Sequence, residues 1–565
     1  MFARESRCPG PLGICYRAPV GNEAETSGGS SSRRWPWLVA LLGVVVLVAG
    51  AAVWNARRNG ALQTAAEEAA RARARRAAPV VELALAPLPI RLPLVERPGK
   101  DADGYPLSYV DRVAVRSLFG RGKYQELTTY FEKFQADFEA DVRNEYWIND
   151  IAETFESAEP ALAAKLDDWV KATKGSFAPY LARGVHRFAA GAAGRGTKWA
   201  KDTHADDMKA MNDAFASALD DFHHVLMLKA RAMPALRYEL RIAFMGAGHR
   251  DLFEPLAKRA FSLCPACFIE RVTYQVGLGP RWGAGYEAMA AAAADANPSV
   301  NSRFKQLAGY ADTDRAETEI RKQNLDAALT LVERACALGD NADFLAVKAD
   351  ILNRRKDFAA ALVAANRALE LRPQRPNLLY IRARIAPSAP AKDWQTAYGD
   401  LSMALRLDPS DSEARSLVPY VSKGLAAAGW EAHQAGKDAE AILWLDQAME
   451  LLPSGELEQR RAEVLTAGFH GTDSEIAALE QRAKADPHDF YAHARLDYAL
   501  SKRNEWPRIA AIWNTFVKEN PNDGRAFLEL GGTLMHQGRV AQARVVVTRA
   551  CELGVSKACV IGKRL

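Results

Sequence analysis

The chain has 565 residues, of which 49% are hydrophobic and 25% are charged, and this is the composition of a folded protein. Its net charge of +5 comes from 74 basic and 69 acidic residues, without a run of five like charges, so we expect no nucleic-acid partner. At roughly 100–200 residues per domain the length suggests several units, or a repeat array whose units pack only on their neighbours. Strong helix formers dominate, and strand-like alternation is nearly absent outside residues 80–95, which predicts an all-α protein.

The chain begins with residues 1–34, whose Gly, Ser, Pro and Arg content predicts a disordered tail. The uncharged stretch Trp37–Trp54 follows, and its 18 residues reach the minimum length for a membrane-spanning helix. Tryptophans at both ends suit the two interfaces, and arginine pairs flank the stretch. We therefore predict a single transmembrane helix over residues 35–56. The alternatives are a cleaved signal peptide, with Ala49–Ala51 as its cleavage site, and a buried core helix.

The flanking charges leave the orientation of this helix nearly undecided, because arginines lie within about 20 residues on both sides. The short N-terminal tail contains no segment that would fold, so we expect it to stay in the cytoplasm. The bulk of the chain would then lie in the periplasm, at a bacterial inner membrane. A cytoplasmic bulk is the alternative. Residues 57–104 continue as an Ala/Arg helix stub and then a proline-rich stretch, which predicts an extended spacer.

A helical middle domain is expected over residues 105–300, with its first helix beginning near Asp111. Four glycines, Gly184, Gly191, Gly194 and Gly196, fall in one part of it, and they predict a loop between two helices.

From residue 308 to 565 the pattern becomes periodic, with a repeat of about 34 residues that predicts stacked pairs of helices. Prolines at Pro453, Pro487 and Pro521 each end one unit, although the last two of these units are degenerate. The last repeat carries the clearest pattern: Gly531 is placed for close helix contact and Gly538 for the turn. Its other matching positions are Phe527, Leu530, Leu534, Val540, Ala543 and Ala550.

These spacings resemble the tetratricopeptide repeat (TPR) family over the last 250 residues or so. The overall prediction is an all-α protein with one transmembrane helix, a helical middle domain and a C-terminal TPR-like α-solenoid.

The middle domain resembles a bacterial family of unknown function, numbered 4034, although Ala284-Gly285 stands where that family has Gly-Ser. The residues that carry this resemblance are Tyr180–Gly184, Arg195-Gly196 with Trp199, Pro280–Gly283 and Tyr286–Met289. The resemblance implies a bacterial protein and carries no activity with it.

In a TPR array the first helix of each pair lines the concave groove, and mixed polar and aromatic side chains there suit a protein or peptide ligand. The Lys/Asn pattern that clamps a C-terminal carboxylate is not reproduced, so a chaperone C-terminus is not the expected ligand. Solvated side chains without a ligand are the alternative. The candidate groove residues are Asp350, Asn353, Arg354, Trp430, His433, Gln434, Met535 and His536.

The middle domain offers one candidate site, made of Arg183, Arg195, Arg281 and Trp282, because arginine can clamp a carboxylate or phosphate through two hydrogen bonds. The alternative is that these side chains only order loops by stacking.

Cys264-Pro265-Ala266-Cys267 is the sharpest short motif. It has three interpretations: two partly buried thiols at a helix end, a structural disulfide if the chain is exported, or a redox pair. It lacks the further ligands that a zinc site needs. The two adjacent histidines His223 and His224 would point in different directions on a helix, so they do not suggest a shared metal ion.

The sequence shows no nucleophile motif or phosphate-binding loop, so we predict no catalytic, cofactor-binding or metal-binding residues. Two functions remain. The first is a membrane-anchored TPR scaffold that binds proteins. The second is an enzyme of unknown reaction housed in the middle domain, to which the repeats recruit substrate.

Overall fold

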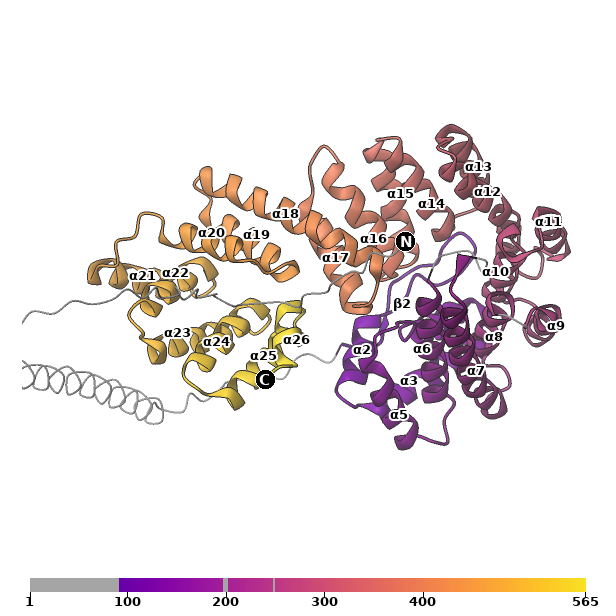
Figure 1. Ribbon diagram of the computed structural model, residues 1–565, viewed down its shortest axis with the longest axis horizontal. Helices are drawn as coiled ribbons and strands as arrows, with labels where there is room; N and C mark the ends of the chain where they lie inside the picture. Colours follow the sequence, from indigo (N-terminus) through magenta and orange to yellow (C-terminus); the bar gives the residue numbers. More distant parts are fainter. Residues whose placement is uncertain (1–90, 197–201, 247–248) are drawn as a thin grey trace, which may run out of the picture. The chain divides into compact units, whose positions relative to one another are not determined.

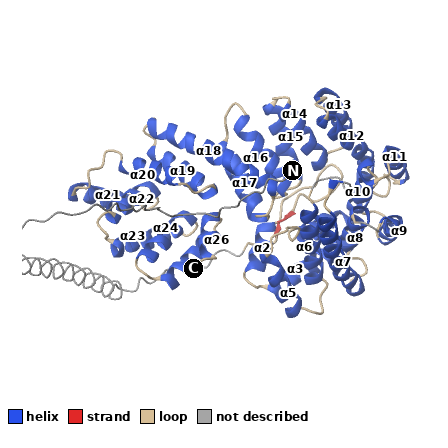
Figure 2. Ribbon diagram, viewed as in Figure 1, coloured by secondary structure: helices blue, strands red, loops and turns tan. Residues whose placement is uncertain are grey.

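The computed structural model describes residues 91–196, 202–246 and 249–565, and these belong to one compact unit. Nearly all of the regular structure is helical (Figure 2). Within these ranges no helix combines the length and the apolar character that crossing a bilayer requires. The predicted tail, the span Trp37–Trp54 and the helix stub lie outside the described residues.

A short hairpin opens the described part of the chain. Strand β1 (Leu94–Val95) pairs antiparallel with β2 (Tyr109–Val110), and Leu94 lies opposite Val110. Between the strands, Tyr105 is buried and Asp101 forms an ion pair with Arg303. Of the predicted spacer the structure describes residues 91–104, and within them Asp101 binds the folded helices through Arg303.

The middle part begins as predicted at Asp111, whose carboxylate accepts the N–H groups of Val113 and Ala114 and caps the first helix. Its helices follow one another with short connections (Figure 1). They are α2 (Arg112–Gly120), α3 (Tyr124–Ala140), η1 (Val142–Asn144), α4 (Glu145–Glu153), α5 (Ala161–Ala172), α6 (Ala178–Arg195), α7 (Ala205–Leu228), α8 (Met233–Met245), η3 (Arg250–Leu252), α9 (Phe253–Leu263), α10 (Phe268–Gly277), η4 (Pro280–Trp282), α11 (Tyr286–Asp295) and η5 (Ser302–Ala308).

The predicted glycine-rich loop does not exist, because Gly184, Gly191 and Gly194 all lie inside α6. A Cβ atom at Gly184 would stand 2.5 Å from the Phe222 ring, so this glycine allows α6 and α7 to pack closely. Gly191 faces Ala214 of α7 at a similarly short distance. Of the four glycines, Gly196 has a positive φ and ends the helix.

From α12 onward the helices pack in consecutive pairs, which confirms the predicted helical-repeat organisation. In the last repeat a Cβ atom at Gly531 would stand 2.6 Å from Val547, and Gly538 turns the chain with a φ of 73°. Both glycines therefore have the positions that the repeat pattern predicts. The helices are α12 (Gly309–Arg321), α13 (Leu325–Ala337), α14 (Ala342–Arg354), α15 (Phe358–Leu371), α16 (Pro376–Ile385), η6 (Ala386–Ser388), α17 (Trp394–Leu407), α18 (Ser412–Gln434), α19 (Asp438–Leu451), α20 (Gly455–Thr466), α21 (Asp473–Ala485), α22 (Phe490–Ser501), α23 (Trp506–Glu519), α24 (Gly524–His536), α25 (Val540–Glu552) and α26 (Ser556–Gly562).

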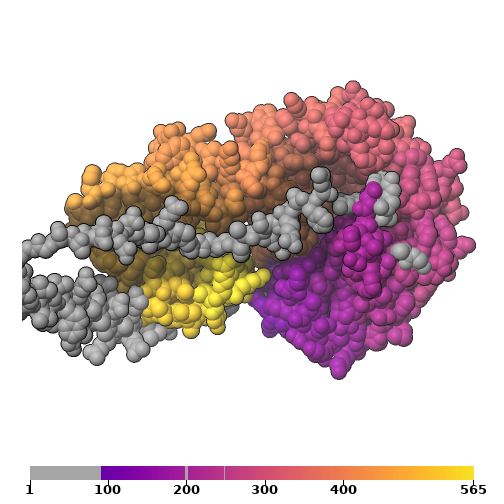
Figure 3. Space-filling model, in the orientation of Figure 1, coloured from indigo at the N-terminus to yellow at the C-terminus, as the bar shows by residue number. Residues whose placement is uncertain are grey.

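The last helices return to the start of the middle part. Arg121, which ends α2, forms an ion pair of 3.1 Å with Glu552 at the end of α25. Arg406 of α17 donates a hydrogen bond to the backbone carbonyl of Glu552. The indigo and yellow surfaces meet at this place in the space-filling view (Figure 3). The first and last helices of the described unit are thus in contact, in addition to the contacts between neighbouring repeats.

Candidate functional site

A cavity of about 900 Å³ lies in the C-terminal repeats. Its walls include Tyr398 from α17, Asp446 from α19, Arg461 from α20 and Met535 from α24, and residues of the turn before α24 also line it. A second cavity of about 240 Å³ continues between α22 and α24. Arg461 and Glu529 line both cavities, so the two spaces adjoin and are together called the groove. Its walls include parts of the first helices α20, α22 and α24 and of the second helices α17 and α19.

Arg461 is the central cation of this groove. Its guanidinium forms ion pairs of 2.6 Å with Asp446 and with Glu529, and these link α19, α20 and α24. The Arg461 side chain is only 18% exposed, so the charge of the guanidinium is poorly hydrated and the two carboxylates compensate it.

Asp497 of α22 faces the same space. Its carboxylate accepts a hydrogen bond of 2.7 Å from the indole N–H of Trp513, which is fully buried. Burial, together with the neighbouring charge of Glu529, raises the pKa of Asp497 to about 7, although Trp513 and Arg461 oppose the shift. The pKa of Asp497 therefore lies near neutral pH, in a space that the Glu529 and Arg461 side chains also line.

Two of the predicted groove residues line these cavities. Met535 is part of the larger cavity, and His536 lines the smaller one, where its ring stacks on Trp506 at 4.1 Å between centroids. Both come from α24, the first helix of its pair, as the repeat pattern implies.

The other predicted groove residues lie elsewhere. On α18, the Trp430 ring lies near His433, and the imidazole of His433 binds Asp438 at 2.6 Å. Gln434 ends the same helix. On α14, Asp350 forms ion pairs with Arg354 and with Arg384 of α16, and Asn353 neighbours them on the helix. None of these residues lines either part of the groove, and their role in partner binding stays a prediction.

Sequence reasoning missed Arg461, Asp497 and Glu529. Two of them belong to pairs that match the repeat pattern poorly. Their meeting depends on the stacking of three helices, since Arg461 and Glu529 are 68 positions apart. The one available signal is that all three are charged residues within first helices of successive pairs.

The predicted middle-domain site divides into two places. Arg183 forms ion pairs with Asp167 and Asp221, which hold α6 against α5 and α7. The other members gather near the end of α6, where the guanidinium groups of Arg195 and Arg281 lie 5.9 Å and 5.3 Å from the centre of the Trp282 ring. Arg195 is buried, and its pKa is lowered by that burial and by the like charge of Arg281. Arg183 is thus held by its own carboxylates, while Arg195, Arg281 and Trp282 lie together, and a binding role for these residues stays a prediction.

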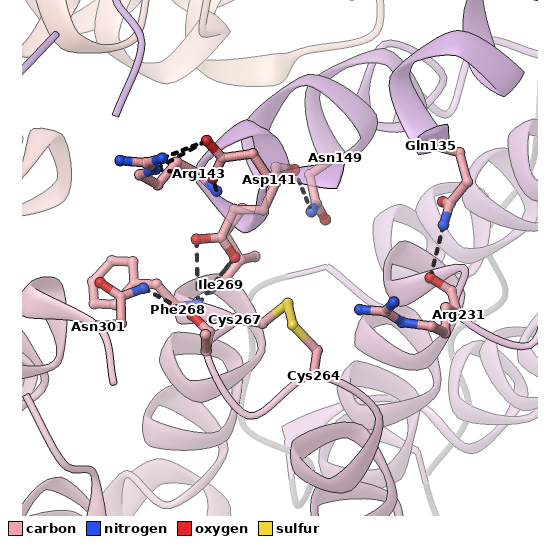
Figure 4. The surroundings of a disulfide bond; sticks show 12 residues. Gln135, Asp141, Arg143, Asn149, Arg231, Cys264, Cys267, Phe268, Ile269 and Asn301 are labelled. Atoms are coloured by element: carbon pink, nitrogen blue, oxygen red, sulfur yellow. Dashed lines mark hydrogen bonds and ion pairs between the residues drawn. A yellow bond between two sulfur atoms is a disulfide. The ribbon is translucent and has the colours of Figure 1, made fainter. Parts of the chain in front are cut away.

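Cys264 and Cys267 are joined by a disulfide, just before α10, and both are buried (Figure 4). The carboxylate of Glu145 accepts the backbone N–H groups of Phe268 and Ile269, so it caps α10. Tyr105 donates a further hydrogen bond to it. A second disulfide joins Cys551 to Cys559.

Three buried groups near this disulfide, Glu145, Cys267 and Glu270, have ligand-type atoms within 4.8 Å of one another. The Cys267 sulfur is bonded to Cys264, and the Glu145 oxygens accept hydrogen bonds from the helix start. Two of the three groups therefore already have structural partners. The arrangement stabilises the N-terminus of α10, which Glu145 caps and the disulfide holds in place.

Beneath the hairpin lies a smaller cavity of about 100 Å³ whose walls are crowded with charges. Arg375 binds Asp343 at 2.8 Å, and Arg372 binds Asp150 at 3.4 Å. These contacts join the middle part to the repeats. Asp150 is shared, because it also binds Arg112 of α2 at 2.8 Å.

No protein-family model matches the chain, and no curated protein matches it. The resemblance of residues 105–300 to the family numbered 4034 thus stays a prediction. Among solved structures, the chain is similar to the TPR domain of P58(IPK), with 14% identity over 62% of this chain and 94% of that one and a TM-score of 0.22. It is also similar to a human IFIT1 dimer with m7Gppp-AAAA, with 12% identity over 78% and 89% of the two chains and a TM-score of 0.25. The TPR2AB-domain:pHSP90 complex of yeast Sti1 has 19% identity over 37% and 89% and a TM-score of 0.15.

Proposed function

We propose that this protein is a membrane-anchored scaffold whose repeat groove binds a segment of another protein. The observation that carries the proposal is the cavity of about 900 Å³ that α19, α20 and α24 line in the C-terminal repeats. Its walls combine apolar side chains such as Leu528 and Met535 with charged ones such as Arg461, and such mixed walls suit an extended peptide or a helix. A groove of this kind uses the rigid stacking of the repeats to present one continuous surface.

The proposal is tested with a photo-crosslinking amino acid placed at Met535, inside the groove, in native membranes. The matched control has the same amino acid at Val363, which is 71% exposed on α15 and does not line the groove. We expect a discrete crosslinked protein from position 535 and none from position 363. Equal products from both positions would contradict a binding role for the groove.

The alternative of an enzyme in the middle domain has little to support it. Arg183 is engaged by Asp167 and Asp221, away from Trp282, and the disulfide of Cys264 and Cys267 is buried. We therefore place the function in the groove and not in the middle part.

We also propose that the bulk of the chain lies in the periplasm, with the span Trp37–Trp54 as its anchor. The two disulfides support this location, because such bonds persist in oxidising compartments. Alkylation of denatured protein from intact cells should modify Cys336 and leave the four paired cysteines unmodified until a reductant is added. Modification of Cys264 and Cys551 without reductant would place the bulk in the cytoplasm.

A further inference from the structure

The walls of the groove have the opposite sign of charge to the chain as a whole. The chain carries a net charge of +5, whereas the groove has six carboxylates against three basic side chains. The carboxylates are Asp446, Glu450, Asp497, Glu519, Asp523 and Glu529, and the basic residues are Arg461, Arg525 and Lys557.

Most of the positive charge in the groove is already used by ion pairs. Arg525 binds Asp523 at 3.0 Å. Arg461 serves Asp446 and Glu529 together, and one Asp446 oxygen is buried without a hydrogen-bond partner. One guanidinium therefore stands among three carboxyl groups, since Asp497 lines the same space and has only the Trp513 indole as a hydrogen-bond donor.

The cavity between α22 and α24 also has more acidic than basic side chains, with Asp497 and Glu529 against Arg461. Asp497 and Glu529 both line it, and the exposed Gly532 lies on the same wall, so no side chain fills the space beside them. A cation that entered there would meet two carboxylates that share a single guanidinium. In a half-buried site such a pairing contributes more than the same pairing in bulk water.

We infer that the ligand of the groove is a protein segment bearing lysine or arginine, and that one such side chain enters between α22 and α24 to pair with Asp497 and Glu529. The inference rests on the proposed binding function of the groove and names the chemistry of the partner. Apolar neighbours of that side chain would contact Leu528 and Met535 in the larger part of the groove. A nucleic-acid backbone or an acidic C-terminus is disfavoured, because its negative charges would meet those of the walls.

The experiment is a membrane-spotted array of random nonapeptides probed with the full-length chain at physiological salt. We expect the bound peptides to be enriched in Lys and Arg and depleted in Asp and Glu. In the double variant Asp497→Asn/Glu529→Gln this enrichment should disappear, and the affinity for the best basic peptide should fall about tenfold or more. The Asn and Gln side chains keep the shape of the groove, so loss of packing does not explain the change.

The matched control is the double variant Glu413→Gln/Glu458→Gln, which removes two exposed carboxylates that line neither part of the groove. It should bind like the unmodified chain. Basic enrichment that survives Asp497→Asn/Glu529→Gln, or peptides bound without basic enrichment, would overturn the inference and leave the scaffold proposal standing. If no peptide bound at all, the scaffold proposal would fail with it.

A last variant replaces Arg71, Arg73, Arg75 and Arg76 of the chain itself with alanine. If this variant bound the basic peptides as the unmodified chain does, a separate protein would be the occupant. Markedly tighter binding would instead mean that these arginines compete for the groove, and the inference of a separate partner would then be wrong.

Discussion

Glu270 illustrates how much a single buried group can determine. It is fully buried on α10, and neither of its carboxylate oxygens has a hydrogen-bond partner. Burial, together with the neighbouring negative charge of Glu145, raises the pKa of Glu270 to about 8. The folded chain therefore holds a proton on this residue that the unfolded chain releases at a much lower pH.

This pKa shift predicts that the free energy of unfolding depends on pH. Because the pKa of Glu270 is higher in the folded chain than in the unfolded chain, its protonation favours folding, and that benefit is lost as pH rises from about 4.5 through about 8. The Glu270→Gln variant cannot ionise. We expect it to be more stable than the unmodified chain at pH 8, by roughly 1–3 kcal/mol, with a smaller difference at pH 5. Thermal unfolding at a series of pH values measures this.

The matched control for this experiment is Glu287→Gln, which neutralises an exposed carboxylate on α11. Its effect should stay within about 0.5 kcal/mol at every pH. Parallel pH profiles for Glu270→Gln and the unmodified chain would show that Glu270 is not held protonated by its surroundings.

At the scale of elements, the repeats are held together by close helix contacts that leave no room for side chains. A Cβ atom at Gly424 of α18 would overlap the indole of Trp394 on α17. Gly399 of α17 has open space around it and is exposed. Both glycines lie inside helices, but Gly424 is packed against a ring and Gly399 faces solvent.

We expect Gly424→Ala to destabilise the protein by roughly 1–3 kcal/mol, because the indole and α18 must move apart. Gly399→Ala should instead stabilise it by about 0.5–1 kcal/mol, since alanine loses less entropy than glycine in a helix. Denaturant unfolding of both variants makes the comparison. Equal effects of the two substitutions would mean that contact with Trp394 does not limit the packing of α18 on α17.

At the scale of the whole described unit, the early and late helices touch through polar contacts. Arg121 pairs with Glu552, and Lys563 lies 3.6 Å from Glu159. The Arg121 side chain is 38% exposed, so this pair contributes little to the free energy of unfolding. Its effect should be on how often α25 opens from α2.

Reversing that charge tests the contact. In Arg121→Glu we expect faster amide hydrogen exchange in Val540–Glu552, with a global stability change of no more than about 1 kcal/mol. Lys123→Glu, two positions away, disrupts the local pair with Glu126 and should leave α25 unchanged. Unchanged exchange in α25 for Arg121→Glu would show that the early and late helices do not hold each other.

The sequence by itself determined the helical class, the start of α2 at Asp111 and the repeat phase in the last units. These features depend on neighbours three or four positions apart, such as the Asp111 carboxylate and the N–H groups of Val113 and Ala114. Gly531 and Gly538 belong to the same class, because a fixed repeat length assigns one to close contact and the other to the turn.

Only the tertiary structure decided how Gly184 and Gly191 are used and which side chains line the groove. Glycine serves both turns and close contacts, and the choice depends on Phe222 of a different helix. Arg461, Asp497 and Glu529 likewise meet because three helices from separate pairs stack side by side. A one-dimensional pattern carries no record of which residues become neighbours across such distances, so the charge of the groove emerges only when the repeats are packed.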